Sequence, residues 1–569
     1  MRDGFLRCDH AIMAQKEDTK MSEFEHVTPE EAGIDSSAIE AFLREEKKAG
    51  VELHSFMIVR DGKIAAEGWA SPYRKDLRHP MYSFSKTLTA AAVGFAVQEG
   101  LLSLDDRLTD LFPEYCPPVI SDHLAKADLR SLLTMSCGHK SEMTMAEAER
   151  FDGNWIRAFL AHPFHFAPGT MFQYNTWGTD LAAAALQKKS GQTLIEYLTP
   201  RLFEPLGITD ATCASRNMGD DFTKTVQGGG WGMKLTTLDM AKFIWFLEQD
   251  GVWDGKRLLN HDYIAQMSAR QIETDNPIYN NGDIASNWRK GYGFQNWQCD
   301  VPGIWRADGA FGQFGLVIPQ KNAIIVLTSC ALNTEAELNI VFDTLLPAMK
   351  GDGAAEPLPE NQASLSSLRS YLEGWELPVL WGIRAPLLEK QYGKIRYAAD
   401  SDTYPSVEDF IAGPGYFEKD GLSVKAVTFR FEDNVAYLDF ELNKKAGHAA
   451  PAFAFDPFSP AGRTVPKGNE HLICHDDDPA DAVTQTLAVG MDGKVRTSHL
   501  TRYHFTASGT FTSPSTFDIN VRNTEMIESV NIRATFFRGM LNLEAVGSIP
   551  ENSSLTIRDI SGMHFSAQS

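Results

Sequence analysis

A serine and a lysine three residues apart have the types and the spacing of a nucleophile and its base. Ser83 and Lys86 stand at the head of a segment whose apolar residues recur at helical spacing. Residues i and i+3 lie on one face of a helix, so the Lys86 amine can reach the Ser83 hydroxyl. A serine becomes nucleophilic when a base takes its proton, and burial can lower a lysine pKa towards neutrality. The pair therefore predicts acyl transfer through Ser83.

The elements that must position this pair can be read from the surrounding residues. We expect a buried helix from Ser83 to about Glu99, ended by Gly100. Its N-terminus would point backbone N–H groups at an oxyanion. S-x-x-K is a common chance match, so its specificity has to come from its neighbours.

Those neighbours resemble the family of class C β-lactamases, DD-peptidases, type VIII esterases and related amide hydrolases. A helix that ends in glycine is followed by Leu-x-Leu-Asp-Asp and Leu-Phe-Pro-Glu, and Pro-Gly-Thr-x-Phe-x-Tyr follows later, as in the family. The resemblance covers about residues 27–346, in the family's order, and it is carried by segments 102–114, 129–138, 168–174, 228–243 and 251–259.

By that resemblance, Tyr174 corresponds to the tyrosine that passes protons between nucleophile, lysine and leaving group. An adjacent cationic Lys86 would favour its phenolate. The family's Tyr-x-Asn reads Tyr174-Asn175-Thr176 here, so Thr176 replaces the asparagine as a substrate-binding residue.

The family's third catalytic segment, Lys-Thr-Gly or His-x-Gly, aligns with Ala307-Asp308-Gly309. Gly309 would let substrate approach a strand edge, and the N–H groups of Ala310 and Ser83 would form the oxyanion hole. The cation that grips a β-lactam carboxylate is absent, which argues against efficient β-lactamase activity. We expect a small ester or amide substrate, with a free amine near Asp308 as a hypothesis that acetylated and free-amine substrates would test.

Four regions are expected along the chain: an N-terminal tail (1–26), a β-lactamase-like hydrolase domain (27–350), a Gly/Pro-rich linker with a short helix (351–396) and a β-rich domain (397–569). The fold class is α+β, with an antiparallel sheet flanked by helices plus a helical subdomain. The strands around Asp61-Gly62 form a hairpin, and 314–318 and 323–329 extend its sheet. The alternation in 427–431 and 530–536 predicts an all-β barrel or sandwich at the C-terminus.

Composition limits the partners. A net charge of −22 disfavours nucleic acid binding, and neither a signal peptide nor a membrane span is apparent, so we expect a cytoplasmic protein. Seven scattered cysteines fit reduced thiols. We expect no cofactor, since no nucleotide or cofactor motif has a supporting context. A metal site at His471, Cys474, His475 and 476–478 is a remote alternative to a solvated loop.

Alternatives remain open. The chain could be a catalytically silent binding or regulatory protein with the same fold, or a D-amino-acid peptidase, and acyl transfer fits the same residues as hydrolysis. The C-terminal domain could cap the cleft, mediate dimerisation or bind a partner, so a homo-oligomer is compatible with the sequence.

Overall fold

A computed structural model describes residues 24–218, 221–276, 279, 286–402, 404, 422–444, 483–500, 504–547 and 560–567. Within these residues no helix combines the length and apolar content needed to cross a membrane. The five described cysteines are free thiols.

The hydrolase domain is built on a seven-stranded sheet in the order β1-β3-β2-β14-β13-β12-β11. Every neighbouring pair is antiparallel except β1 with β3. Asp61 (φ 51°) and Gly62 (φ 73°) form the tight turn between β2 and β3, as their positive-φ preference predicts. The strands are β1 (Glu25–His26), β2 (Glu52–Arg60), β3 (Lys63–Trp69), β11 (Trp297–Gln298), β12 (Trp305–Gly309), β13 (Gln313–Ile318) and β14 (Ala323–Cys330).

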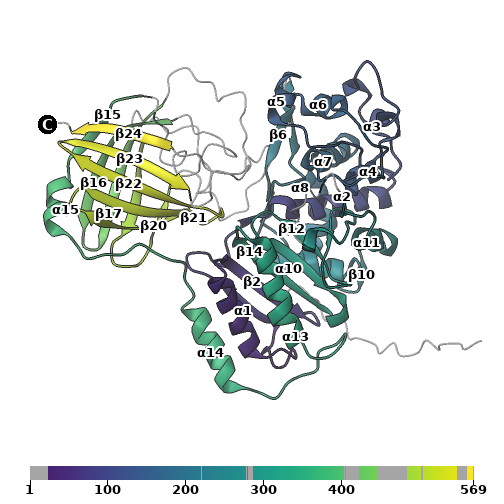
Figure 1. Ribbon diagram of the computed structural model, residues 1–569, viewed down its shortest axis with the longest axis horizontal. Coiled ribbons are helices and arrows are strands. Elements are labelled where there is room, and N and C mark those ends of the chain that lie inside the picture. The colour runs from purple at the N-terminus through teal and green to yellow at the C-terminus, as the bar shows by residue number, and fades with distance from the viewer. Residues whose placement is uncertain are drawn as a thin grey trace, which may run out of the picture.

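Helices cover both faces of this sheet (Figure 1). Its central strands accordingly carry apolar residues at successive positions. Phe56 and Ile58 join the core on the side of α1 (Ser36–Lys48) and α14 (Gln362–Glu373). Met57, between them in β2, joins the larger core on the other face, with α2 (Ser85–Gln98) and α10 (Thr237–Glu248). The period-two alternation of a strand produces this division.

A mainly helical region continues from α2 and lies beside the sheet (Figure 1). Three small sheets complete it: β4 (His79–Pro80), β8 (Met233–Leu235) and β5 (Thr212–Cys213); the hairpin of β6 (Ser215–Met218) with β7 (Asp221–Gln227); and β9 (Val252–Trp253) with β10 (Lys256–Arg257). Its helices are α3 (Leu108–Leu111), α4 (Leu129–Leu133), α5 (Met145–Glu149), α6 (Trp155–Ala161), α7 (Thr176–Ser190), α8 (Leu194–Leu198), α9 (Glu204–Leu206) and α11 (His261–Ser268). The expected α+β class with a helical subdomain is confirmed.

The C-terminal region forms a β-barrel. Ten strands follow the order β18-β17-β16-β15-β24-β23-β22-β21-β20-β19, and a further pairing of β18 with β20 at Gly490 and Ser508 closes the sheet. The strands are β15 (Arg396–Ala399), β16 (Leu422–Glu432), β17 (Val435–Lys444), β18 (Val483–Gly490), β19 (Arg496–His499), β20 (His504–Ser513), β21 (Thr516–Asn523), β22 (Ser529–Phe537), β23 (Met540–Gly547) and β24 (Ile560–Ala567). Of the two expected architectures, barrel or sandwich, the strand order gives the barrel.

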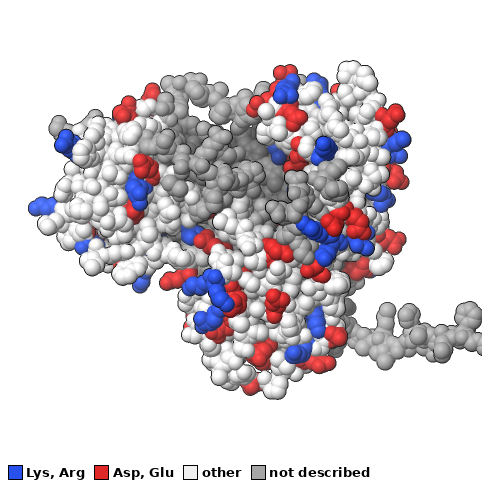
Figure 2. Space-filling view, viewed as in Figure 1, with Lys and Arg blue, Asp and Glu red and all other residues white. Residues whose placement is uncertain are grey.

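The barrel core follows directly from the sequence alternation. Val427 and Phe429 are fully buried in it, whereas Thr428 and Arg430 between and after them are only half-buried. α14 and α15 (Pro386–Tyr392) lie on the connection between the two domains. On the face drawn in Figure 2, acidic and basic side chains are interspersed over the hydrolase domain, and the barrel is mostly uncharged.

Candidate active site

Ser83 lies in a tight turn that leads into α2. A 3-10 turn spans Tyr82–Phe84, and the α-helix begins at Ser85, two residues later than expected. The difference arises at Tyr82, whose left-handed backbone (φ 46°) cannot belong to a regular α-helix. Ser83 itself is half-buried.

The Lys86 amine lies 3.0 Å from the Ser83 hydroxyl oxygen, and its side chain is buried. Two other oxygens surround the same nitrogen: the Gly230 carbonyl at 2.5 Å and the Thr176 hydroxyl at 3.3 Å. A neutral amine has two N–H groups and one lone pair. When Gly230 and Thr176 accept the two N–H groups, the lone pair faces the Ser83 O–H.

Burial lowers the pKa of Lys86 to about 8, because the charged ammonium loses its hydration. The negative charges of Glu142 and Asp180 act in the opposite direction. A substantial fraction of the lysine is therefore neutral in mildly alkaline solution, which suits a general base.

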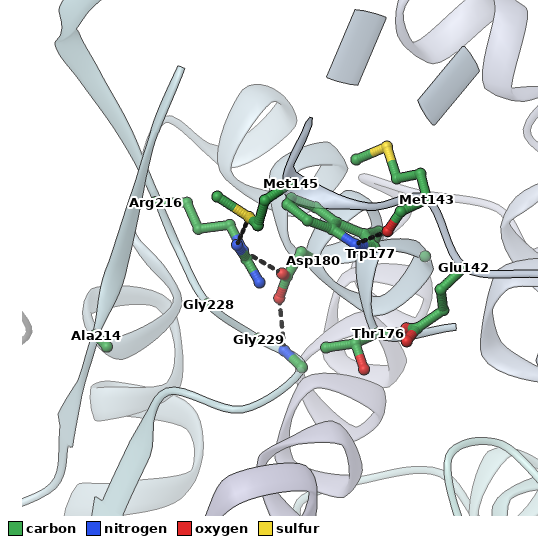
Figure 3. Close-up of polar contacts among 12 residues, drawn as sticks. Glu142, Met143, Met145, Thr176, Trp177, Asp180, Ala214, Arg216, Gly228 and Gly229 are labelled. Carbon is green, nitrogen blue, oxygen red and sulfur yellow. Dashed lines mark hydrogen bonds and ion pairs between the residues drawn. The ribbon is translucent and has the colours of Figure 1, made fainter. Parts of the chain in front are cut away.

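Asp180 lies beside the glycine segment 228–230 and Arg216 (Figure 3). One of its carboxylate oxygens accepts the Gly230 N–H at 2.8 Å, and the other accepts from Arg216 Nε at 2.7 Å. The Arg216 guanidinium also lies 4.0 Å from the centroid of the Trp177 ring. Because Asp180 stands one turn after Thr176 on α7, a single helix presents both the Thr176 hydroxyl that contacts Lys86 and the carboxylate that holds Gly230.

Two glycines are needed for this close approach. A Cβ at Gly230 would lie 2.7 Å from Thr176 Cγ2, and one at Gly229 would lie 2.6 Å from Thr89 Oγ1. The sequence points to segment 228–243 as a family segment but does not show that the Gly230 carbonyl meets the lysine. The roles of Asp180 and Arg216 are also absent from the sequence reading.

Tyr174 lies beside the pair, just before α7. Its ring centroid is 4.9 Å from the Lys86 nitrogen, and the ring stacks on Trp297 at 5.8 Å. Burial raises the pKa of Tyr174 well above its usual value, and a hydrogen bond with Ser83 offsets only part of this. In this environment burial therefore acts against the expected phenolate, and the role of Tyr174 as the proton-passing tyrosine stays a prediction.

The third segment lies at the end of β12, which packs against the Tyr82–Phe84 turn. A Cβ at Gly309 would lie 2.2 Å from the Met81 carbonyl, so only glycine allows this approach to the nucleophile turn. Gln313 then holds the next residue, donating from its amide to the Ala310 carbonyl at 2.9 Å. The strand end thus brings Ala310 beside the turn that contains Ser83.

Asp308 is paired within its own strand, and the amine preference expected near it stays a hypothesis. Its carboxylate accepts from Arg306 Nε at 2.8 Å, and the Arg306 side chain is fully buried. Arg306 stands two residues earlier on the same face of β12 and lies 4.6 Å from the Trp288 ring. The positive charge of Arg306 offsets the negative charge of Asp308, so little of the Asp308 charge is left for a substrate.

Aromatic residues line the Tyr174 side of the site. Trp297, Tyr292 and Phe172 form a buried cluster against which Tyr174 and Tyr279 pack. The aromatic residues between positions 288 and 305 fall into two groups. Trp288, Tyr292 and Trp297 belong to this cluster, and Phe294 and Trp305 belong to the main core. Trp231 lies instead near Arg216.

The described residues contain no group of three or more His, Cys, Asp or Glu side chains placed to hold a metal ion. The remote metal alternative, from His471 to residue 478, lies outside the described residues.

Comparisons with known proteins identify the family. A family model described as Beta-lactamase matches residues 37–343, more than half of the chain. A lovastatin esterase from Penicillium rubens is 30% identical over 151 residues, which cover 23% of this chain and 38% of that protein. A D-aminopeptidase from Brucella anthropi is 30% identical over 200 residues, covering 32% of this chain and 37% of that protein. The match thus spans well under half the length of either relative.

A solved family VIII carboxylesterase aligns over 56% of this chain and 98% of its own, with 17% identity and a TM-score of 0.45. The family model covers every strand of the seven-stranded sheet except β1, together with the nucleophile turn, α7 and β12, and so includes Ser83, Lys86 and Tyr174. The chain belongs to the Beta-lactamase family.

Proposed function

We propose that the chain is a serine hydrolase that cleaves a small ester or amide through an acyl-enzyme on Ser83. The observation that carries this proposal is the environment of Lys86. Its nitrogen contacts Ser83 Oγ, and two other acceptors surround it. Burial brings the pKa of Lys86 to about 8, so neutral lysine can take the serine proton.

In the acylation step, Ser83 Oγ forms a bond to the substrate carbonyl carbon while its proton passes to Lys86. The carbonyl oxygen becomes an oxyanion that the N–H groups of Ser83 and Ala310 bind. Tyr174 keeps its proton and can pass it to the leaving alcohol or amine, then recover a proton from Lys86. The leaving group departs neutral, and the acyl group remains on Ser83.

In deacylation, a water molecule or another acceptor attacks the acyl carbon. Lys86 is neutral again and takes the acceptor's proton, directly or through Tyr174, and Ser83 regains its own. Hydrolysis and transfer to an acceptor differ only in the nucleophile that enters the site at this stage.

The substrate is proposed as an ester or linear amide rather than a β-lactam. By the resemblance to the family, Ala307 stands where a lysine or histidine is usual, and the nearby cation, Arg306, is paired with Asp308. The aromatic cluster around Tyr174 favours an apolar acyl or leaving group.

A fluorophosphonate probe tests the proposal. We expect labelling of the wild-type chain, its loss in Ser83→Ala, and unchanged labelling in Ser103→Ala, which removes an exposed serine elsewhere. Folded wild type that stays unlabelled would support the silent binding protein instead. Short-chain esters, linear amides, D-aminoacyl amides and a chromogenic cephalosporin, assayed in parallel, would identify the substrate class.

A further inference from the structure

One loop of the barrel reaches the nucleophile turn. The β21–β22 loop (residues 524–528) leaves the barrel core and carries Ile527, whose side chain is fully buried. Ile527 forms a separate small apolar cluster with Phe311 of the hydrolase domain. Tyr82, Ala310 and Cys330 pack against the same cluster.

This cluster contains chain neighbours of the two residues whose N–H groups are expected to bind the oxyanion. Tyr82 directly precedes Ser83, and Phe311 directly follows Ala310. Their rings meet edge to face, with centroids 5.7 Å apart. Each ring is one residue away from a donor, so a displacement of Tyr82 or Phe311 that involves the backbone would also move the adjacent N–H group.

Both aromatic residues adopt a backbone conformation that bulky side chains disfavour. Tyr82 has φ 46° and Phe311 has φ 64°, both in the left-handed region. Such residues persist only where surrounding contacts hold them. On the hydrolase side, Gln313 binds the Ala310 carbonyl, and on the opposite side the packing comes from Ile527.

The loop that carries Ile527 is itself firmly attached to the hydrolase domain. Tyr73 donates its phenol O–H to the Met526 carbonyl at 2.8 Å. Arg522, at the end of β21, binds both carboxylate oxygens of Glu52 at 2.6 and 2.9 Å. These contacts leave Ile527 little freedom to move away from Phe311.

We propose that Ile527 is a positioning residue of the hydrolase site. Through its packing against Phe311, the barrel holds the two oxyanion-hole N–H groups in position. The inference rests on the proposed function and assigns the barrel a part in it. Barrel docking and catalytic rate are then coupled: a barrel that docks imperfectly leaves Tyr82 and Phe311 free to relax.

The test uses the full chain with Ile527→Ala. Removal of a whole oxyanion donor costs about 10²–10³-fold in kcat, so loosening both donors should lower kcat by roughly tenfold, with KM nearly unchanged. Ile527→Val, which keeps the branched side chain, should restore most of the rate. Ile532→Ala is the matched control: it makes the same truncation in the barrel core, away from Phe311, and should leave kcat unchanged while the chain is folded.

Amide hydrogen exchange supplies a readout that does not depend on activity. In Ile527→Ala the backbone N–H groups of residues 309–314 should exchange faster than in wild type, and in Ile532→Ala they should not. Equal kcat values for the two alanine variants, or unchanged exchange in Ile527→Ala, would overturn the inference and leave the hydrolase proposal standing. An inactive, unlabelled wild type would remove the hydrolase proposal, and with it the catalytic role of Ile527, whatever the exchange shows.

Discussion

The hydrolase domain and the barrel differ in what they bury. Around its site, the hydrolase domain buries Lys86, Asp180 and Arg306 almost completely. The barrel core consists of apolar side chains at alternate strand positions, and ion pairs such as Arg430 with Asp439 stay partly exposed. Buried charges cost free energy unless they are paired, so the group around Ser83 marks a place where chemistry, rather than stability, has shaped the sequence.

The largest effect is expected at the base. Lys86→Met should lower kcat on the order of 10²–10⁴-fold, because it removes the group that takes the Ser83 proton. The free energy of unfolding should stay the same or rise, since an uncharged side chain replaces a buried amine. Steady-state kinetics and thermal unfolding of the same preparation check both. A variant that keeps wild-type kcat would show that another group activates Ser83.

A substitution in the barrel core should have the opposite effect: it should lower stability and leave kcat unchanged. Phe429→Ala removes a fully buried ring and should cost about 3–5 kcal/mol of stability, as large-to-small core substitutions do. Its kcat, measured where the variant is still folded, should match that of wild type. A large loss of kcat without loss of stability would contradict the division between the two domains.

The pH dependence tests the state of the lysine. Since the Lys86 pKa is about 8 and the neutral amine is the active form, kcat/KM should rise about tenfold per pH unit below this value and level off above it. The contribution of Lys86 to stability also increases with pH. The depressed pKa disfavours the protonated lysine in the folded state, so this contribution grows as pH rises from about 8 to the pKa of 10.5 in the unfolded chain. A rate that is flat from pH 6 to 9 would argue against a lysine base.

A smaller effect is expected at Asp180, which is one contact away from Lys86. Asp180→Asn removes a charge that raises the Lys86 pKa and leaves Arg216, which lowers it, uncompensated. The alkaline plateau should therefore begin at lower pH than in wild type. The plateau kcat should fall by about tenfold at most, because Gly230 keeps a side-chain acceptor. A profile that moved to higher pH would contradict the assigned electrostatics.

Much of the fold could be predicted because its signals are local. Asp61-Gly62 identified a hairpin, and the alternation around Phe429 identified an antiparallel strand with one buried face. The start of the nucleophile helix was missed, because the left-handed turn at Tyr82 has no sequence pattern of its own. Burial opposes the expected Tyr174 phenolate in a way that the sequence does not show, since the packing of the ring depends on residues such as Trp297 that are far away in the chain.

The sequence by itself determined that Ser83 and Lys86 share one helical turn and that the C-terminal strands bury alternate residues, because both follow from the geometry of a few consecutive residues. Only the tertiary structure decided that Gly230 meets the lysine, that Arg306 neutralises Asp308 and that Ile527 lies against the nucleophile turn. Gly230 and Ile527 join segments more than a hundred residues from their partners, and the Arg306 pair depends on complete burial. Packing, rather than spacing, sets such contacts.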